Sequence, residues 1–226
     1  MDDIDDNLPY CKIIFIGDPS VGKSSILSRF YDDKFELEYQ PTIGLDFQHK
    51  NYEIKGNTIK LYLYDTAGQE KYKSLIPMYI RDTNIILIVY DITVKESFTH
   101  TDQWFKETED LRRKDAILVL VGNKIDLEEK RQISTKEAED YAAQKGFLFH
   151  EVSAKSGEGI EELFYKKIFQ EIEKTFFMND SNEGNNNNGE NIGGVKLSGE
   201  QEQHAPKKGR CCGGGNKRSN KNENKL

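Results

Sequence analysis

Residues 11–24 read CKIIFIGDPSVGKS, and this stretch is the strongest indication of the fold. The apolar run Cys11–Gly17 is typical of a buried strand, and the residues from Lys23 to about Asp32 favour a helix. The turn between them, Gly17–Ser24, fits the pattern GxxxxGK[ST] of loops that cradle phosphate groups. Because such a loop follows a strand and opens a helix, the context favours a phosphate site over the alternative, a Gly-rich turn without a ligand.

The residue types at the fixed positions of this loop suggest its chemistry. Its backbone N–H groups and the N-terminus of the following helix would bind β- and γ-phosphate oxygens. Lys23 would bridge these phosphates, and the Ser24 hydroxyl would be a ligand of Mg²⁺. The sequence therefore predicts a nucleotide site with Mg²⁺ as its cofactor.

Outside the loop, strand-like and helix-like patterns alternate along the chain. Besides Cys11–Gly17, the expected strands are Asp46–Ile54, Thr58–Asp65, Ile85–Tyr90, Ala116–Val121 and Leu148–Val152. Besides the helix at Lys23, we expect a long helix between the fourth and fifth strands, with Trp104 and Phe105 on its buried face. A capping box of Ser134 and Glu137 predicts a helix that runs to about Lys145. A last helix is expected at Ile160–Phe177. A short KGN connection predicts a hairpin of the second and third strands. This order predicts an α/β fold with a six-stranded, mostly parallel sheet, one antiparallel edge strand and about five helices.

Three further motifs fall at the ends of expected strands. Asp65 opens DTAGQE and stands where a second Mg²⁺ ligand belongs, although an ordinary Asp-Thr turn is the alternative for this residue alone. NKID (Asn123–Asp126) and SAK (Ser153–Lys155) follow the fifth and sixth strands, at the edge where open α/β sheets bind ligands. The Asp126 carboxylate could accept from both N1–H and N2–H₂ of guanine, which adenine lacks, so it predicts selectivity for GTP over ATP.

Composition excludes several classes of protein. The chain has 226 residues with 32 Lys and Arg against 39 Asp and Glu, a net charge of −7 that argues against coating nucleic acid. Its apolar runs end at about six residues, below the roughly 18 of a membrane-spanning helix. The acidic start MDDIDD predicts neither a secretory signal nor myristoylation. Three cysteines are too few to staple a small fold, which favours a reducing, cytosol-facing compartment.

The sequence predicts three segments: an acidic N-terminal extension, 1–8, a domain, 9–177, and a disordered tail, 178–226. Asn and Gly supply 20 of the 49 tail residues, which cannot bury enough surface to form a core. Residues 207–226 hold seven positive and one negative side chain around the pair Cys211 and Cys212. A membrane-directed basic segment and a solvated linker with incidental lysines both fit this composition.

With these motifs in order, residues 9–177 resemble the Ras-like small GTPases, and specifically the Rab family. The resemblance rests on IGLDF (Ile43–Phe47), KLYLYDTAGQE (Lys60–Glu70), EKYKS (Glu70–Ser74) and IVYDIT (Ile88–Thr93). The stretch Ser74–Asn84, SLIPMYIRDTN, is similar to the Golgi-associated "Rab-six" branch, whose members steer retrograde vesicle traffic. The resemblance implies a P-loop small-GTPase domain that hydrolyses GTP to GDP and phosphate and regulates vesicle-mediated transport.

The resemblance also assigns roles to individual residues. Thr42 matches the threonine that ligates Mg²⁺ and senses the γ-phosphate, Gly68 matches a glycine whose N–H touches that phosphate, and Gln69 matches the glutamine that orients the attacking water. Phe35 matches an aromatic residue across the guanine base, Asn123 ties the base loop to the phosphate loop, Lys124 packs along the nucleotide, and the Ala154 N–H meets guanine O6. The full set of implied GTP contacts is Gly17, Asp18, Pro19, Ser20, Val21, Gly22, Lys23, Ser24, Ser25, Phe35, Tyr39, Thr42, Gly68, Asn123, Lys124, Asp126, Ser153, Ala154 and Lys155, with Ser24, Thr42 and Asp65 as metal ligands.

Partners and location follow from the same resemblance. Phe47, Tyr64 and Tyr79 match an effector-facing aromatic triad, for which plain core packing is the alternative. Implied partners are effectors, an exchange factor, a GTPase-activating protein, a GDP-dissociation inhibitor, an escort protein and a membrane surface, but no nucleic acid. The expected location is the cytoplasmic face of intracellular membranes, with the Golgi favoured and a cytosolic pool.

The sequence departs from the family pattern at three places. Pro19 stands where relatives carry Gly or Ser, and it removes one loop N–H and fixes φ. Tyr64 replaces a Trp in the triad. Fourteen residues follow the pair Cys211 and Cys212, so three readings stay open: the tail is processed to a prenylated end, the pair is modified internally, or the contact with the membrane is only electrostatic.

Two other functions compete with the GTP/GDP switch. A phosphotransferase or ATPase could share the phosphate loop, but NKID, SAK and the lack of a lid region count against it. A scaffold that binds GTP without hydrolysing it is the other alternative, because Pro19 could suppress turnover. Guanine selectivity would exclude the first, and hydrolysis would exclude the second.

Overall fold

The structure is a computed structural model that describes residues 8–36, 42, 45–66 and 76–177. The chain divides into two units, Met1–Gly184 and Asn185–Leu226, and every described residue lies in the first. The predicted extension 1–8 and tail 178–226 fall almost entirely outside the described residues, so the predicted segment boundaries stay predictions.

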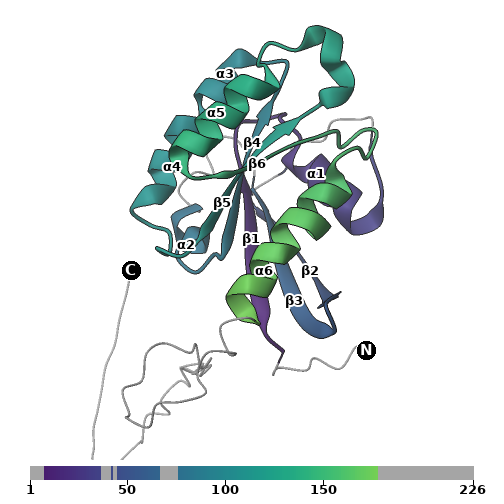
Figure 1. The fold of residues 1–226 in the computed structure, drawn as a ribbon, viewed down its shortest axis with the longest axis vertical. Coiled ribbons are helices and arrows are strands. Elements are labelled where there is room, and N and C mark those ends of the chain that lie inside the picture. The colour runs from purple at the N-terminus through teal and green to yellow at the C-terminus, as the bar shows by residue number, and fades with distance from the viewer. Residues whose placement is uncertain (1–7, 37–41, 43–44, 67–75, 178–226) are drawn as a thin grey trace, which may run out of the picture. The chain divides into compact units, whose positions relative to one another are not determined.

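Six strands form one sheet in the order β2-β3-β1-β4-β5-β6 (Figure 1). Their bounds are β1 Tyr10–Ile16, β2 Leu45–Ile54, β3 Asn57–Thr66, β4 Ile85–Asp91, β5 Ile117–Asn123 and β6 Leu148–Val152. All neighbouring strands pair in parallel except β2 and β3, which form the predicted antiparallel hairpin. The mostly parallel sheet with one antiparallel edge strand is therefore confirmed.

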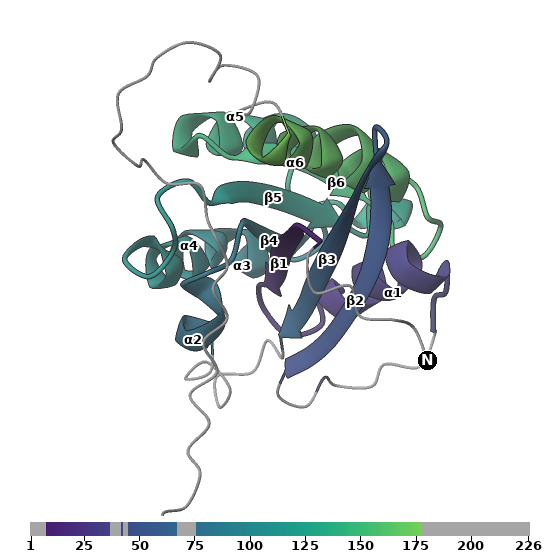
Figure 2. The ribbon, with the colours of Figure 1, turned by 90° about the horizontal axis from the view of Figure 1, so that it is seen from below.

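The helices cover both faces of this sheet. Their bounds are α1 Lys23–Asp32, α2 Ile76–Ile80, α3 Lys95–Thr99, α4 Thr101–Glu109, α5 Thr135–Lys145 and α6 Phe169–Phe176, with a 3₁₀ segment at Ile125–Lys130 and a π-helical segment at Glu162–Ile168. Figure 2 shows α3 and α4 on one side of the sheet and α1 on the other, and the buried residues of α5 join the apolar cluster of α4 whereas those of α6 join the cluster of α1. Each face has its own apolar cluster, because strands covered on both sides bury every residue. All seven residues of β4 are buried accordingly.

Local patterns explain most of the elements. The side chains of β3 alternate between buried and part-exposed along most of the strand, as its sequence predicted. Helix α5 begins with Ser134, whose side chain accepts a hydrogen bond from the Glu137 N–H, and it ends at Gly146 in the left-handed region. The predicted bounds of all six strands and of the helices at Lys23 and Ser134 agree with the structure to within two residues.

One helical prediction is wrong, and another is right in its bounds but incomplete. The single long helix expected between β4 and β5 is two helices, α3 and α4, separated by His100. The Thr99 and Thr101 hydroxyls donate to the carbonyls of Lys95 and Phe98, and such contacts bend helices. The expected last helix, Ile160–Phe177, is π-helical over Glu162–Ile168 before α6 begins.

The parallel strands all end at the same edge of the sheet, and this edge carries the predicted site. The phosphate loop follows β1, Asp65 lies near the end of β3, Asn123 ends β5, and Ser153 follows β6. The strand order reverses at β1, so this is the crevice where open α/β sheets bind ligands. Among the described helices, none is long and apolar enough to cross a membrane.

Candidate functional site

Two glycines of the phosphate loop occupy positions that a side chain cannot. Gly17 has φ +141°, and a Cβ atom there would lie 2.3 Å from the Val89 carbonyl oxygen. Gly22 has φ +97°, and a Cβ atom there would lie 2.2 Å from Asn123 Nδ2. The loop therefore passes close to β4 at one end and to the NKID segment at the other.

The N-terminus of α1 is suited to an anion. Gly22 caps this helix without a side-chain hydrogen bond, and the first turn contains no acidic residue. The first N–H groups of a helix have no partner within it, and the helix dipole adds partial positive charge at this end. Ser24 and Ser25 lie in this turn. A phosphate group would satisfy these donors, as the sequence predicted.

Lys23 is held inside the loop. Its side chain is 5% exposed, and its Nζ donates to the carbonyl oxygens of Gly17 at 3.0 Å and Asp18 at 2.8 Å. Burial lowers the pKa of Lys23 to about 8, against the opposing effect of the Asp65 and Asp18 carboxylates. A buried ammonium is costly without an anion, so this side chain is poised to bind a phosphate.

Three oxygen-bearing side chains converge beside this lysine. Ser24 Oγ lies 2.5 Å from Asp65 Oδ2 and 2.7 Å from Thr42 Oγ1, and Thr42 donates to the same carboxylate at 3.2 Å. Neighbouring ligands of an octahedral Mg²⁺ lie about 2.9 Å apart, given Mg–O distances near 2.0–2.1 Å. The three predicted metal ligands, from the loop, β3 and position 42, therefore have the spacing of one metal site.

The charge state of Asp65 supports the same ligand set. Burial raises the pKa of its carboxyl, and Oδ1 is buried without a hydrogen-bond partner. An unpaired buried carboxylate oxygen is costly, and a cation would offset this cost. No group of three or more His, Cys, Asp or Glu that could hold a metal occurs among the described residues. One carboxylate with two hydroxyls, completed by water and phosphate oxygens, fits Mg²⁺.

Asn123 ties the base loop to the phosphate loop, as the resemblance implied. Its Nδ2 donates to the Val21 carbonyl at 2.8 Å, and its Oδ1 accepts from the Ala154 N–H at 3.1 Å. The Ala154 N–H, expected to meet guanine O6, is thus already engaged. A guanine base in this site would either share the Ala154 N–H with Asn123 Oδ1 or replace Asn123 as its acceptor.

Asp126 is oriented by its neighbours in the SAK segment. The Ser153 hydroxyl donates to Asp126 Oδ1 at 2.7 Å, and Lys155 Nζ lies 3.8 Å from Oδ2. The Asp126 side chain is part-buried, with 17% of its surface still exposed. Lys124 lies over the phosphate loop, where its Nζ donates to the Ser20 carbonyl at 2.8 Å.

Two residues that the sequence reasoning missed support these segments. Asp91 ends β4, and its carboxylate pairs with Lys124 at 2.6 Å and accepts from the Thr93 N–H. Because Asp91 stands at the end of a strand, at the edge of the sheet that carries the site, its position could have predicted this role. Arg29 donates to the carbonyls of Ala154 and Lys155 at 3.0 and 2.9 Å. No local signal marks this arginine, because its partners are more than 100 residues away.

The predicted aromatic triad forms a continuous cluster. Ring centroids lie 5.2 Å apart for Phe47 and Tyr64, and 5.4 Å apart for Tyr64 and Tyr79. Tyr64 and Tyr79 are partly buried against the second apolar cluster, but Phe47 is 43% exposed. Core packing thus accounts for two of the rings and leaves the third available to a partner.

The remaining predicted residues divide into two groups. Pro19 and Ser20 are exposed, with Ser20 in the left-handed region at φ +63°, and Phe35 packs partly buried against the first apolar cluster. Tyr39, Gly68, Gln69, Cys211 and Cys212 lie outside the described residues, and their assigned roles stay predictions.

Comparison with protein-family models gives a match over most of this domain. The model of the Ras family matches residues 12–174, a span that contains the phosphate loop, the three oxygen ligands and both base-loop segments. The match covers more than half of the 226 residues.

Proposed function

The chain belongs to the Ras family and is a GTP-binding small GTPase, and from this premise we propose that it regulates vesicle-mediated transport at intracellular membranes. The observation that carries the proposal is the exposed ring of Phe47, packed on Tyr64 at the outer strands of the sheet. Large exposed aromatic residues are frequent anchors of protein–protein interfaces. We further propose the Rab family and its Golgi branch as the closest class.

The switch would act through Thr42. Its hydroxyl lies at 2.7 Å from Ser24 and 3.2 Å from Asp65, the two other residues that would hold Mg²⁺. That ion would neutralise charge on the β- and γ-phosphates. Loss of the γ-phosphate would weaken the hold on Thr42, and with it the segment that leads into β2 and Phe47. Partners would then distinguish GTP from GDP through this strand.

Effector binding tests this proposal. We expect Tyr64→Trp to change the affinity for a GTP-dependent partner, because Tyr64 links Phe47 to Tyr79. Nucleotide affinity should stay unchanged, because among the described residues the ring contacts of Tyr64 are with Phe47 and Tyr79, outside the phosphate loop. The GTP-loaded chain would be used to capture partners from a Golgi-enriched extract, with the GDP-loaded chain as control. The captured partners would then serve as ligands in the affinity measurement. Equal loss of both affinities would make Tyr64 a structural residue and contradict the proposal.

Hydrolysis by the isolated protein is proposed to be slow. Pro19 removes one donor near the γ-phosphate, and no arginine lies in the Thr42 segment (residues 35–47) to stabilise the transition state within the chain. We expect single-turnover hydrolysis to accelerate by about 10³-fold or more when a GTPase-activating protein supplies an arginine. Rapid hydrolysis by the purified chain would contradict this expectation. No hydrolysis even with the activator would favour a scaffold that only binds GTP.

Membrane attachment is proposed to use Cys211 and Cys212 with the basic residues around them. Two lipid chains, or one chain with a basic patch, are needed for stable anchoring. The intact mass of the protein from membrane fractions should exceed that from soluble fractions by two lipid groups. The double variant Cys211→Ser/Cys212→Ser should become soluble, whereas Cys11→Ala should stay on membranes, because Cys11 is buried in the core. An unmodified mass in both fractions would contradict lipid anchoring.

We also propose regulatory partners, on the basis of the resemblance to the Rab family. An exchange factor, a GTPase-activating protein, a GDP-dissociation inhibitor and an escort protein are expected as partners of a lipid-anchored small GTPase. The dissociation inhibitor gives the clearest test, since it would extract only the lipid-modified, GDP-bound chain from membranes. Equal extraction of the GTP-loaded and GDP-loaded wild-type chains from membranes would exclude this mode of cycling between membrane and cytosol.

A further inference from the structure

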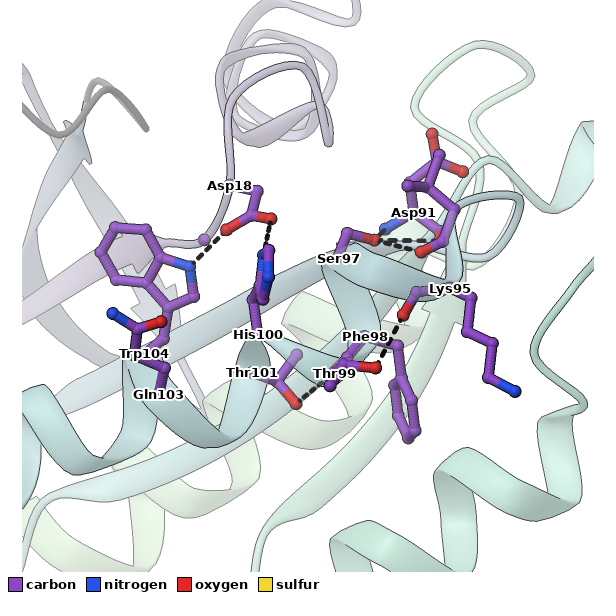
Figure 3. A network of polar contacts seen from close by, with 12 residues as sticks. Asp18, Asp91, Lys95, Ser97, Phe98, Thr99, His100, Thr101, Gln103 and Trp104 are labelled. Atoms are coloured by element: carbon purple, nitrogen blue, oxygen red, sulfur yellow. Dashed lines mark hydrogen bonds and ion pairs between the residues drawn. The ribbon is translucent and has the colours of Figure 1, made fainter.

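The carboxylate of Asp18 is held between two donors from another part of the chain (Figure 3). Trp104 Nε1–H donates to Asp18 Oδ1 at 2.8 Å, and His100 Nδ1 lies 2.6 Å from Asp18 Oδ2. Asp18 belongs to the phosphate loop, whereas Trp104 lies in α4 and His100 at the junction of α3 and α4. The two oxygens of one side chain thus connect the loop to this helix pair.

The chemistry of the partners sets the direction of both hydrogen bonds. An ionised carboxylate only accepts hydrogen bonds, so the His100 Nδ1 must carry the proton in this contact. The indole nitrogen of Trp104 can only donate, and its residue is 3% exposed. Both donors therefore offset part of the negative charge that the Asp18 carboxylate places in a loop that receives phosphates.

The helix pair is itself fixed to the sheet. The Asp91 N–H, at the end of β4, donates to Ser97 Oγ at 3.0 Å, and this hydroxyl donates back to the Val94 carbonyl at 2.7 Å. Ser97 is buried at 3% exposure. Figure 3 shows this contact at one end of the helix pair and the Asp18 contact farther along it. The loop is thereby tied to a rigid strand through the helices.

Asp18 also has a direct connection to the lysine of the loop. Its backbone carbonyl accepts from Lys23 Nζ at 2.8 Å, next to the Gly17 carbonyl at 3.0 Å. The side chain of Asp18 thus faces the helices while its carbonyl holds the ammonium that is to bind phosphate. If the side chain were released, the carbonyl could rotate away from Lys23.

We propose that His100 and Trp104 are positioning residues for nucleotide binding, which act through Asp18 to keep the phosphate loop and the Lys23 ammonium in their binding arrangement. This inference rests on the nucleotide-binding function of the chain. It adds two residues that lie outside the loop, about 80 residues farther along the sequence.

The test is the dissociation rate of a fluorescent GDP from the full-length protein. His100→Ala and Trp104→Phe should each raise this rate about three- to tenfold, because each removes one hydrogen bond to a charged group, in the case of His100 a partly exposed one. His100→Gln, which keeps a donor of similar reach, should restore most of the wild-type rate. Gln103→Ala is the matched control, since Gln103 is exposed on α4 and bonds to Glu107 within the same helix.

Action through Asp18 is tested by a double-mutant cycle. In an Asp18→Ala background, His100→Ala should have no further effect on the GDP dissociation rate, because its partner is already absent. Equal fold-changes in both backgrounds would show that His100 acts by another route and would overturn the proposal.

The single tryptophan of the chain supplies a direct structural readout. Its indole N–H gives one resonance in a ¹H–¹⁵N spectrum, and Asp18→Ala should move this resonance upfield because the hydrogen bond is lost. Gln103→Ala should leave it in place. Variants that lower the melting temperature but release GDP at the wild-type rate would show a merely structural role and overturn the inference. A wild-type protein that retains no GDP would contradict the nucleotide function itself, and the inference with it.

Discussion

Single residues of the phosphate loop show why this sequence has little freedom there. Gly22 lies at φ +97°, and the space that a Cβ atom would need is occupied by the Asn123 amide. The same amide reaches the Val21 carbonyl and the Ala154 N–H. One glycine therefore allows two segments 100 residues apart to meet.

This contact leads to a first prediction. Gly22→Ala should weaken GTP binding more than tenfold and lower the free energy of unfolding by about 2 kcal/mol or more, because it adds both backbone strain and an overlap with Asn123. Gly146→Ala is the matched control: φ is +72°, but nothing lies within 4 Å of the added Cβ atom. Backbone strain alone should lower the free energy of unfolding of Gly146→Ala by about 1–2 kcal/mol and leave GTP binding unchanged. Equal effects of both variants in titrations and urea unfolding would exclude the overlap as a cause.

Lys23 leads to a second prediction at this scale. Burial lowers its pKa to about 8, so the ammonium is a cost to the nucleotide-free fold. Lys23→Met should therefore not reduce the free energy of unfolding of the nucleotide-free protein at pH 7. GTP affinity should fall by at least about 100-fold, because a buried charged contact to phosphate is lost. Urea unfolding and nucleotide titration measure the two quantities. A large loss of stability without nucleotide would show that Lys23 mainly holds the loop carbonyls.

A third prediction concerns the choice of base. The Asp126 carboxylate is part-buried and oriented by the Ser153 hydroxyl at 2.7 Å. Asp126→Ala should reduce the preference for GTP over ATP by about 100-fold or more, because two donors of guanine then lack an acceptor. Competition between the two nucleotides measures this ratio. Glu128→Ala, which removes a nearby exposed carboxylate that pairs with Arg131, should leave this ratio unchanged.

At the scale of elements, side-chain contacts decide where helices bend or join. The helix between β4 and β5 divides at His100, and the residues of Glu162–Ile168 form π turns. The sequence could not predict either feature. Leu163 and Phe164 precede Ile168 by five and four residues, so this apolar spacing suits a π-helix and an α-helix alike.

The contact between α4 and α5 allows a prediction of pH dependence. Hydrogen bonds from Lys145 on α5 and from Lys106 lower the pKa of Asp102 to about 2, from 3.8. Because the folded-state pKa is the lower one, the stabilisation is present above about pH 4 and disappears as the pH falls towards 2. Asp102→Asn should lower the free energy of unfolding by at most about 1 kcal/mol at pH 7, since the pair of Asp102 and Lys145 is partly exposed.

Urea unfolding at a series of pH values would measure this dependence. The difference between wild type and Asp102→Asn should shrink as the pH is lowered below 4. Asp140→Asn is the control, because Asp140 pairs with Lys136 within α5 on the exposed surface. A difference that stays constant down to the lowest pH at which the protein folds would show that the interaction does not depend on the charge of Asp102.

At the scale of the whole molecule, the sequence predicted the features that a local motif or the repeated alternation of strands and helices marks. The mostly parallel sheet with one antiparallel edge strand followed from the strand and helix patterns, and the placement of Ser24, Asp65, Asn123 and Asp126 at its carboxyl edge followed from motifs at strand ends. Residues that act across long separations escaped prediction. Asp18 meets Trp104 86 positions away, and Arg29 meets Ala154 125 positions away. Such pairs depend on how the elements pack, which no local pattern records.

The outermost strand of the sheet has a consequence for solubility. In the described sheet β2 pairs only with β3, so its other side presents backbone N–H and C=O groups to which another chain could add. Exposed Asp46, His49, Lys50 and Glu53 lie along this strand. These polar and charged groups would have to lose water for edge-to-edge pairing, which opposes it. The strand that carries the exposed Phe47 is thus protected by its polar and charged residues against self-assembly into fibres.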